Sequence, residues 1–538
     1  MGAGVGAARR RRGTAAGLFG AALLVAVTVL TASGAYAQSS PTPGGHSAGQ
    51  GEGDDDQGDQ GGKQGDQGGR KGDHGKGTPR TGESPNAGPT RRAEPPAGST
   101  PGSNDSAVAR PAPATGAVLA TAENGPEAAV PTAQGLQQVL APALADKNLG
   151  TVTVAVADAA GGRLLYGSGE NTPATPASTT KLATSVAALS LIPGDTRLTT
   201  WVVSGADPGA ITLVGGGDPT LTALPADQVQ IGGQPADADT APASLEALAR
   251  QTATALKAAG TTTVKLDYDL SMYAGNPQHK NHDAQNIALV VPLMVDEAKV
   301  DPKSREEAPA RVADPAGAAA EAFAALLAAQ GVTVEGRARP AAAPVAADAT
   351  VLGKVDSPTV ARLVERLLTT SDNQLAEAIA RQVALAARQP ASFEGAATAV
   401  TQELTKLGVP MTGVVLNDGS GLHPGNAIPP AVLVQLLALA ASEQHPALRP
   451  VLTGLPVAGF TGTLNKRYGS GSGAADAAGL IRAKTGTLSG VNTLAGTVVD
   501  ADGRLLAFAV MTRTSAPADT ARAAMDRIVA HLTTCGCH

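Results

Sequence analysis

Residues 38–131 limit what this chain can fold into more than any other feature, because they offer almost nothing for a hydrophobic core. Stretches such as residues 51–56 and 58–62 contain no apolar side chain. A segment of this kind cannot offset the entropy lost on ordering, so it is expected to remain a disordered linker. Patterned sequence begins near Thr132, and the folded part of the 538-residue chain is therefore expected within residues 132–538.

The N-terminus has the organisation of an export signal. Four arginines, residues 9–12, precede an apolar stretch over residues 15–32, which ends at the small-x-small sequence Ala35-Tyr36-Ala37. This pattern predicts a signal peptide over residues 1–37 that is cleaved after Ala37. The apolar stretch is also close to the minimum length for a membrane span, so an uncleaved signal anchor is the alternative. Either outcome predicts an extracytoplasmic protein, secreted or anchored to the outer face of the cytoplasmic membrane.

Composition narrows the possible partners and cofactors. The formal net charge is −6, whereas a nucleic-acid-binding protein usually has a basic face, so no nucleic-acid partner is expected. The two cysteines, Cys535 and Cys537, fit neither a redox nor a metal motif, and a tight disulfide or a pair of exposed thiols is expected. The eight histidines lack metal-ligand spacing such as H-E-x-x-H, and no metal or cofactor is predicted.

Strand-like segments occur at both ends of the folded region. Their alternating apolar residues predict strands over residues 151–157, 163–166, 490–499 and 504–512, and a helix over 517–533. An antiparallel sheet built from the two chain ends, with helices packed against it, is an α+β arrangement. Residues 206–356 differ, with many prolines, short β-like runs and a helix over 315–329, which has Asp314 and Pro315 at its start. We therefore expect an inserted domain over 206–356, between catalytic segments 132–205 and 357–538.

The first motif with chemical meaning is Ser178-Thr179-Thr180-Lys181, at the head of a helical run. Residues three apart on a helix share a face, so Lys181 can reach the Ser178 hydroxyl. A serine needs an adjacent base to become a nucleophile, and a lysine can serve if burial and a second cation lower its pKa. Alone, an S-x-x-K sequence is more often an ordinary helix cap followed by a surface lysine.

Two further motifs complete the pattern. Ser371-Asp372-Asn373 begins another helical run, and there Ser371 could relay a proton while Asn373 orients Lys181 and a substrate amide. Lys484-Thr485-Gly486-Thr487 lies in a predicted strand, where a glycine often marks close approach by a ligand. A peptide could add to this strand edge, with the hydroxyls of Thr485 and Thr487 binding a terminal carboxylate and Lys484 supplying positive charge. Each motif alone is weak, but the order S-x-x-K, S-x-N, K-T-G is typical of penicillin-binding proteins and class A β-lactamases.

The chain resembles the class C low-molecular-mass penicillin-binding proteins, which are D-alanyl-D-alanine carboxypeptidases and endopeptidases. The resemblance covers residue 132 to the C-terminus and includes the runs 214–221, 371–377, 417–422 and 455–464. The 193 positions from Ser178 to Ser371 are more than a class A β-lactamase would have, and they suit an inserted domain. The chain departs from the family pattern at His423-Pro424, where a Ser-Arg-like pair is expected, and His423 is expected to be a loop residue without chemistry.

The resemblance implies a penicillin-binding-protein/β-lactamase-like transpeptidase fold, an antiparallel sheet with helices on both faces, and an acyl-enzyme mechanism. It implies that Ser178 attacks the penultimate D-Ala carbonyl of a peptidoglycan stem peptide, with an oxyanion hole formed by the backbone N–H groups of Ser178 and Thr487. β-Lactams would acylate the same serine. Leu488 is implied to line the pocket for the substrate side chain. A serine β-lactamase, an esterase and a catalytically silent peptidoglycan-binding protein are the alternatives, and the balance between carboxypeptidase and endopeptidase activity stays open.

Overall fold

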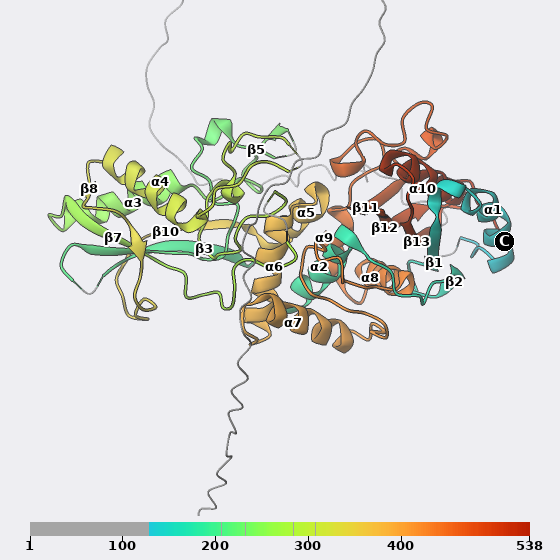
Figure 1. Ribbon diagram of the computed structural model, residues 1–538, viewed down its shortest axis with the longest axis horizontal. Helices are drawn as coiled ribbons and strands as arrows, with labels where there is room; N and C mark the ends of the chain where they lie inside the picture. Colours follow the sequence, from blue (N-terminus) through green and yellow to red (C-terminus); the bar gives the residue numbers. More distant parts are fainter. Residues whose placement is uncertain (1–127, 206, 232, 283–284, 307) are drawn as a thin grey trace, which may run out of the picture. The chain divides into compact units, whose positions relative to one another are not determined.

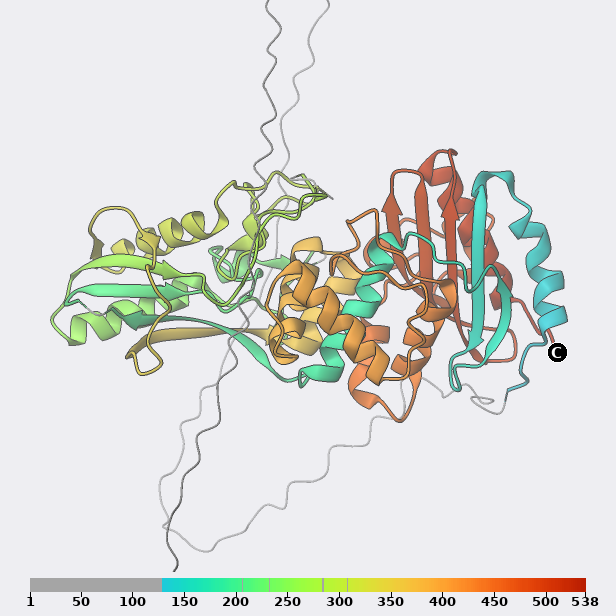
Figure 2. The same cartoon turned by 60° about the horizontal axis from the view of Figure 1, so that its bottom comes forward.

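A five-stranded antiparallel sheet forms from the two ends of the folded region, as the sequence predicts. The computed structural model describes residues 128–538 except 206, 232, 283–284 and 307, so the predicted signal segment and almost all of the predicted linker lie outside it. Strand order is β11-β12-β13-β1-β2, and Figure 2 shows the first and last strands of the chain, blue and red, side by side. The strands are β1 (Thr151–Asp158), β2 (Leu164–Ser168), β11 (Ile481–Leu488), β12 (Val491–Val499) and β13 (Leu505–Arg513).

Helices cover both faces of this sheet, which confirms the predicted α+β class (Figure 1). Alternate residues of β1 point to opposite faces, so Val154 and Val156 pack in one core while Ala155 and Ala157 pack in the other. On the valine side lie α1 (Ala133–Leu144) and α10 (Ala518–Thr533), and on the alanine side lies α8 (Pro430–Ala441).

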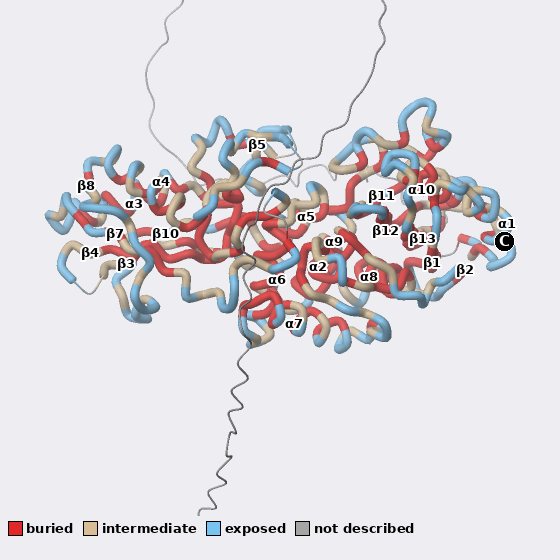
Figure 3. Tube along the Cα trace, in the orientation of Figure 1, coloured by how far each residue is buried: buried red, intermediate tan, exposed pale blue. Residues whose placement is uncertain are grey.

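The remaining helices of this part form a layer around α2 (Thr180–Leu191), whose residues from Thr180 to Leu189 are all buried. Such burial requires small side chains, which the alanine-rich sequence supplies. Figure 3 shows α2 as a continuous buried segment beside α8. The surrounding helices are α5 (Val360–Thr370), α6 (Asn373–Ala386), α7 (Phe393–Lys406) and α9 (Arg449–Thr453).

A second, mixed sheet accounts for the predicted insertion. Its strand order is β10-β3-β4-β7-β8, with β9 also paired to β7, and two helices pack against it. The helix predicted over 315–329 forms as α4, with the Asp314 carboxylate capping it by accepting from Gly317 N. The strands and helices of this part of the chain are β3 (Arg197–Ser204), β4 (Ala210–Val214), β5 (Gln230–Ile231), β6 (Gln234–Pro235), α3 (Leu245–Ala258), β7 (Thr263–Asp269), α4 (Pro315–Ala329), β8 (Thr333–Val334), β9 (Arg339–Pro340) and β10 (Val351–Thr359). Strands β5 and β6 pair with each other in a separate two-stranded sheet.

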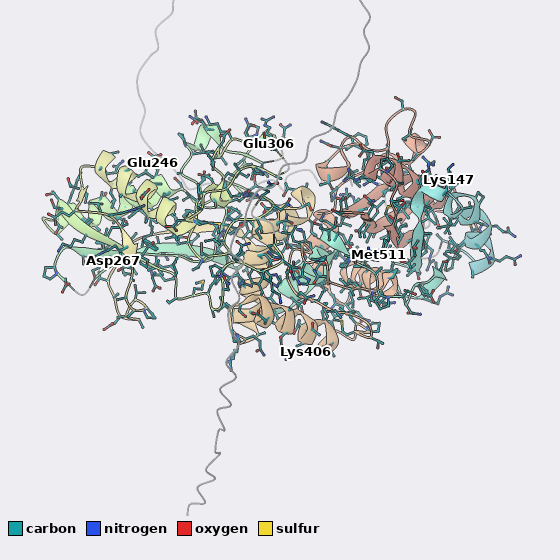
Figure 4. The ribbon with its side chains drawn as sticks, viewed as in Figure 1. Lys147, Glu246, Asp267, Glu306, Lys406 and Met511 are labelled. Carbon is teal, nitrogen blue, oxygen red and sulfur yellow. A yellow bond between two sulfur atoms is a disulfide. The ribbon has the colours of Figure 1, made fainter. Side chains whose placement is uncertain are left out.

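The second sheet includes residues on both sides of the predicted insertion, residues 206–356. Strands β3 and β10 pair with each other at the two ends of this sheet region, and we propose Arg197 and Thr359 as the limits of the inserted region. The pairing joins strands about 150 residues apart, so local periodicity could not reveal it. In Figure 4 the labelled Glu246 and Asp267 lie in the inserted region, and Lys406 and Met511 lie in the other part.

The two ends of the described chain are fastened to each other. Thr132 N donates to Cys537 O, and Cys537 is joined to Cys535 by a disulfide, one of the two expected states of this pair. The Arg504 side chain forms a two-pronged ion pair with Asp158 and also donates to Ala128 O. None of the described helices is long and apolar enough to span a membrane.

Candidate active site

Ser178 and Lys181 meet at the start of α2. The chain enters through a single 3₁₀ turn, Ala177–Thr179, and Thr179 Oγ1 stabilises that turn by donating to Pro176 O at 2.7 Å. The turn leads directly into the helix, so the Lys181 side chain lies one turn above Ser178 and its Nζ is 2.8 Å from Ser178 Oγ. Lys181 is fully buried while Ser178 lines an open cleft, which places the base behind the nucleophile.

Lys181 has two further partners, and both are acceptors. Its Nζ donates to Asn373 Oδ1 at 2.7 Å and to the carbonyl oxygen of Ser420 at 2.7 Å. The amide nitrogen of Asn373 donates to Asn286 O, which fixes the amide orientation. Neither the amide oxygen of Asn373 nor the carbonyl oxygen of Ser420 can donate a hydrogen bond. Both N–H groups of a neutral lysine amine must therefore point to these two acceptors. Its lone pair then points at the Ser178 hydroxyl, the orientation a general base requires.

Burial lowers the pKa of Lys181 to about 8. The carboxylates of Asp418, Glu377 and Asp372 oppose this decrease, because each stabilises the ammonium form. The lowering of the Lys181 pKa by burial agrees with the sequence-based expectation, whereas the expected second cation is not among the causes of the shift. With a pKa of about 8, roughly a tenth of the lysine is neutral at pH 7.

Ser371 and Lys484 form the second hydrogen-bonded pair of the site. Ser371 lies between α5 and α6 with a left-handed backbone (φ 60°), and Asp372 caps α6 by accepting from Leu375 N at 2.9 Å. Lys484 Nζ reaches from β11 to Ser371 Oγ at 2.8 Å and to Thr485 O at 2.7 Å. The Lys484 amine is thus fixed beside the hydroxyl that the sequence assigns to proton transfer.

The outer edge of β11 is half covered. Residues 456–458 pair with its beginning, where Ala483 N donates to Pro456 O and Ala458 N donates to Ile481 O. Edge-directed groups alternate along an antiparallel strand, so the N–H and C=O of Thr487 face the same edge further along. This second half of the edge lines the cleft and can accept an extended peptide.

Gly486 allows β11 to approach the nucleophile closely. A β-carbon at this position would lie 2.8 Å from Pro176 O, closer than real side chains approach, and 3.0 Å from Ser178 N, which is also unusually tight. Thr493 Oγ1 ties the neighbouring strand to the same place by donating to Pro176 O at 2.8 Å. Ser178 and Thr487 therefore lie on adjacent backbones, as the predicted oxyanion hole requires.

The side chains of Thr485 and Thr487 point to the opposite face of β11 from the Lys484 side chain, as strand alternation dictates. Thr485 Oγ1 lies 2.7 Å from Thr463 Oγ1, and Thr487 Oγ1 accepts from the Arg522 guanidinium at 3.1 Å. All of these hydroxyls and Arg522 line the cleft. Sequence reasoning missed Arg522 because it lies on α10, 35 positions beyond Thr487.

The cleft has a volume of about 1250 Å³ and runs between the inserted region and the sheet. Most of the predicted site residues line it, whereas Lys181 and Lys484 lie buried behind it. Its far wall belongs to the inserted region and includes Glu297, which is held by Arg366 and Lys299. The lining members of the predicted set are Ser178, Ser371, Asn373, Thr485, Gly486, Thr487 and Leu488.

A buried carboxylate pair supports the Ser420 carbonyl. Glu377 accepts from Gly419 N and Ser420 N, and Asp418 accepts from Gly421 N, His423 N and the Asn426 side chain. His282, from the inserted region, lies 2.8 Å from Asp418. Oxygen and nitrogen atoms of His282, Glu377 and Asp418 lie within 4.8 Å of one another, a donor set that could suit a cation. These carboxylates already hold backbone and side-chain donors, and we assign no metal to them.

Comparison with known proteins places this geometry in a family. The profile of the D-Ala-D-Ala carboxypeptidase 3 (S13) family matches residues 136–309 and 298–532. Carboxypeptidase DacB of Mycolicibacterium smegmatis is 36% identical over 419 residues, which cover 76% of this chain and 86% of the relative. The D-alanyl-D-alanine carboxypeptidase of Actinomadura sp. strain R39 is 29% identical over 429 residues, covering 68% and 79%.

Among solved structures, penicillin binding protein 4 (dacB) from Haemophilus influenzae has a TM-score of 0.58 at 20% identity. The match covers 74% of this chain and 98% of that chain. At this level of identity the likeness concerns the fold, which agrees with the predicted penicillin-binding-protein architecture.

Proposed function

The chain belongs to the D-Ala-D-Ala carboxypeptidase 3 (S13) family, and on that premise we propose that it cleaves the D-Ala–D-Ala bond of peptidoglycan stem peptides through an acyl-Ser178 intermediate. The observation that carries this assignment is the hydrogen-bond arrangement of Lys181. Two acceptor-only oxygens and the Ser178 hydroxyl surround its nitrogen. A neutral lysine in this environment can accept the serine proton while Ser178 attacks the substrate carbonyl.

The substrate lies along the open half of β11. Its scissile carbonyl oxygen accepts from the backbone N–H groups of Ser178 and Thr487, and in other enzymes losing one such donor costs roughly 3–4 kcal/mol. The terminal carboxylate of the substrate binds the hydroxyls of Thr485 and Thr487 and the Arg522 guanidinium. Arg522 supplies a positive charge to this part of the cleft. Leu488 lies beside the substrate side chain, at the end of the same strand.

Ser371 relays to the leaving amine the proton that Lys181 takes from Ser178: its hydroxyl gives one proton to the amine and receives the other in exchange. Lys484 Nζ donates a hydrogen bond to the Ser371 oxygen. The hydroxyl proton of Ser371 is therefore free to point into the cleft. The leaving D-Ala departs as an amine, and water then hydrolyses the acyl-serine. A β-lactam carries a comparable carboxylate and amide, so it acylates the same serine.

The family acts on wall peptides, so we propose that the catalytic domain works outside the cytoplasm. The apolar residues 15–32 support either cleavage and secretion or retention as an anchor. Mass measurement of the protein exported by its native cell separates the two, because cleavage after Ala37 removes the first 37 residues.

Intact-mass spectrometry with benzylpenicillin tests the assignment. The full-length chain is expected to gain one lasting adduct, and a Ser178→Ala variant none; the wild-type chain is also expected to release D-Ala from a D-Ala-D-Ala peptide. Rapid loss of drug without a lasting adduct would indicate a β-lactamase. A folded wild-type chain that neither forms an adduct nor consumes the drug would leave the silent peptidoglycan-binding alternative.

A further inference from the structure

His282 connects the inserted region to the catalytic centre. Its side chain is 1% exposed, and its Nε2 lies 2.8 Å from Asp418 Oδ2, whose own side chain is fully buried. The histidine is held in place by aromatic contacts with His279 and Phe393, at centroid distances of 4.9 and 5.2 Å. A polar group buried this deeply is costly unless it is hydrogen-bonded, so Asp418 is its natural partner.

Asp418 organises the turn that contains the Ser420 carbonyl. Its Oδ1 accepts from Gly421 N at 2.9 Å and from Asn426 Nδ2 at 2.6 Å, and its Oδ2 accepts from His423 N at 2.7 Å. The same turn is held from the other side by Glu377, which accepts from Ser420 N at 2.8 Å. The direction of the Ser420 carbonyl is therefore set by two buried carboxylates, one of which depends on His282.

The Ser420 carbonyl is one of the two acceptors that orient Lys181. It receives Lys181 Nζ at 2.7 Å, and only when this acceptor and Asn373 Oδ1 are both in place does the lone pair of a neutral amine point at Ser178. A shift of the turn would let the amine rotate and lose that direction. The hydrogen bond between His282 and Asp418 thus affects the orientation of Lys181 through one loop, although His282 itself does not contact the substrate.

We propose that His282 is a positioning residue for the catalytic lysine: by donating a hydrogen bond to Asp418 it fixes the Ser420 carbonyl and thereby directs Lys181 at Ser178. This role rests on the proposed acyl-enzyme function and adds to it a dependence on the inserted region. Ser178 and Lys181 lie outside the inserted region, but the alignment of Lys181 with Ser178 requires a side chain from that region.

Matched variants of His282 separate hydrogen bonding from packing. His282→Gln keeps an N–H at about the position of Nε2, whereas His282→Leu fills the space without a donor. The acylation rate constant of the full-length chain with saturating benzylpenicillin is expected to fall about 10- to 100-fold in the leucine variant, because small misplacements of a catalytic group have effects of this size. The glutamine variant is expected to stay within about threefold of the wild type, and the non-covalent affinity for the drug to stay unchanged in both.

The pH profile supplies a readout that a purely structural role would not move. Loss of the histidine donor removes one interaction that neutralises the Asp418 carboxylate, and the charge of that carboxylate favours the Lys181 ammonium. The acylation profile of His282→Leu should therefore shift to higher pH, while that of His282→Gln should not. Charged or titratable groups around His282 come from its own segment, from the 418–423 turn and from α6 and α7: His279, Asp418, His423, Glu377, Arg381 and Glu394.

His279→Phe is the control, because this residue stacks on the same cluster but is not hydrogen-bonded to Asp418. It is expected to acylate like the wild type. A folded His282→Leu variant with wild-type acylation would overturn the proposal, and so would a His282→Gln variant with a large loss of rate or a shifted profile. The glutamine variant decides the matter by itself if the leucine variant does not fold. A wild-type chain that is not acylated at all contradicts the proposed function instead.

Discussion

At the scale of single residues, the site is a set of polar side chains whose hydrogen bonds fix their protonation chemistry. Lys181 is the clearest case, since its partners determine both where its lone pair points and how readily it loses a proton. Burial works against its ammonium form, and nearby carboxylates restrain the effect. The result is a base with a pKa of about 8, close to neutral pH, and a general base is most effective when its pKa lies near the pH of the reaction.

Acylation is therefore expected to depend on the ionisation of Lys181. Only the neutral amine can accept the serine proton, so the second-order rate constant with benzylpenicillin should rise about tenfold per unit below the inflection and level off above a pH of about 8. Stopped-flow or mass-spectrometric rates across the neutral and alkaline range measure the profile. In a Glu377→Gln variant the inflection should move to lower pH, because one charge that favours the ammonium is gone. A flat profile would argue against Lys181 as the base.

At the scale of elements, the site depends on how closely β11 lies against the turn that begins α2. The third motif contributes its lysine to one face and its threonines to the other, and its glycine permits the contact between them. Its open edge exists because residues 456–458 stop pairing after Ala483. Peptide binding and oxyanion stabilisation are consequently two uses of one strand edge.

A methyl group added at Gly486 should disable the site with little effect elsewhere. In Gly486→Ala the new carbon meets Thr493 Oγ1 at 2.2 Å as well as the backbone at Pro176 and Ser178, so the strand and the turn must separate. The acylation rate should fall by about 100-fold, the size of effect expected for a displacement near 1 Å. Gly469→Ala is the matched control, since no atom lies within 4 Å of its added carbon and acylation should be unchanged.

At the scale of the whole molecule, the catalytic part is assembled from segments on either side of a large insertion. In the five-stranded sheet β1 pairs with β13, so the first and last strands of the described chain lie next to each other. A buried ion pair, Asp158–Arg504, joins a residue at the end of β1 to the turn before β13, with both side chains 9% exposed. This pair makes one core of segments that are 346 positions apart.

Removing one partner of this pair should destabilise the whole catalytic part. Arg504→Met leaves the Asp158 carboxylate buried without its counter-ion, and a loss of about 3–5 kcal/mol in the free energy of unfolding is expected. Denaturant unfolding measures it. The double variant Asp158→Leu, Arg504→Met should recover much of the loss, because no buried charge remains. Arg337→Ala, which breaks an exposed pair with Glu321, serves as the comparison and should cost less than about 1 kcal/mol.

Local patterns in the sequence determined the class of fold and the main chemical groups of this protein. Alternating residues predicted β1, β12 and β13, and helix caps predicted α4, because these features depend on near neighbours alone. The three motifs also predicted Ser178, Lys181, Ser371, Asn373 and Lys484 as one site, and the structure brings these residues together as two hydrogen-bonded groups.

Tertiary structure alone decided which further groups complete the site. Arg522, His282 and the Ser420 carbonyl come from separate parts of the chain, and no local spacing links them to the motifs. The pairing of β3 with β10, from which we propose the limits of the inserted region, is equally remote in sequence. A pattern read along the chain reports the periodicity of one element, whereas these contacts depend on how elements pack, and packing brings distant residues within hydrogen-bond distance.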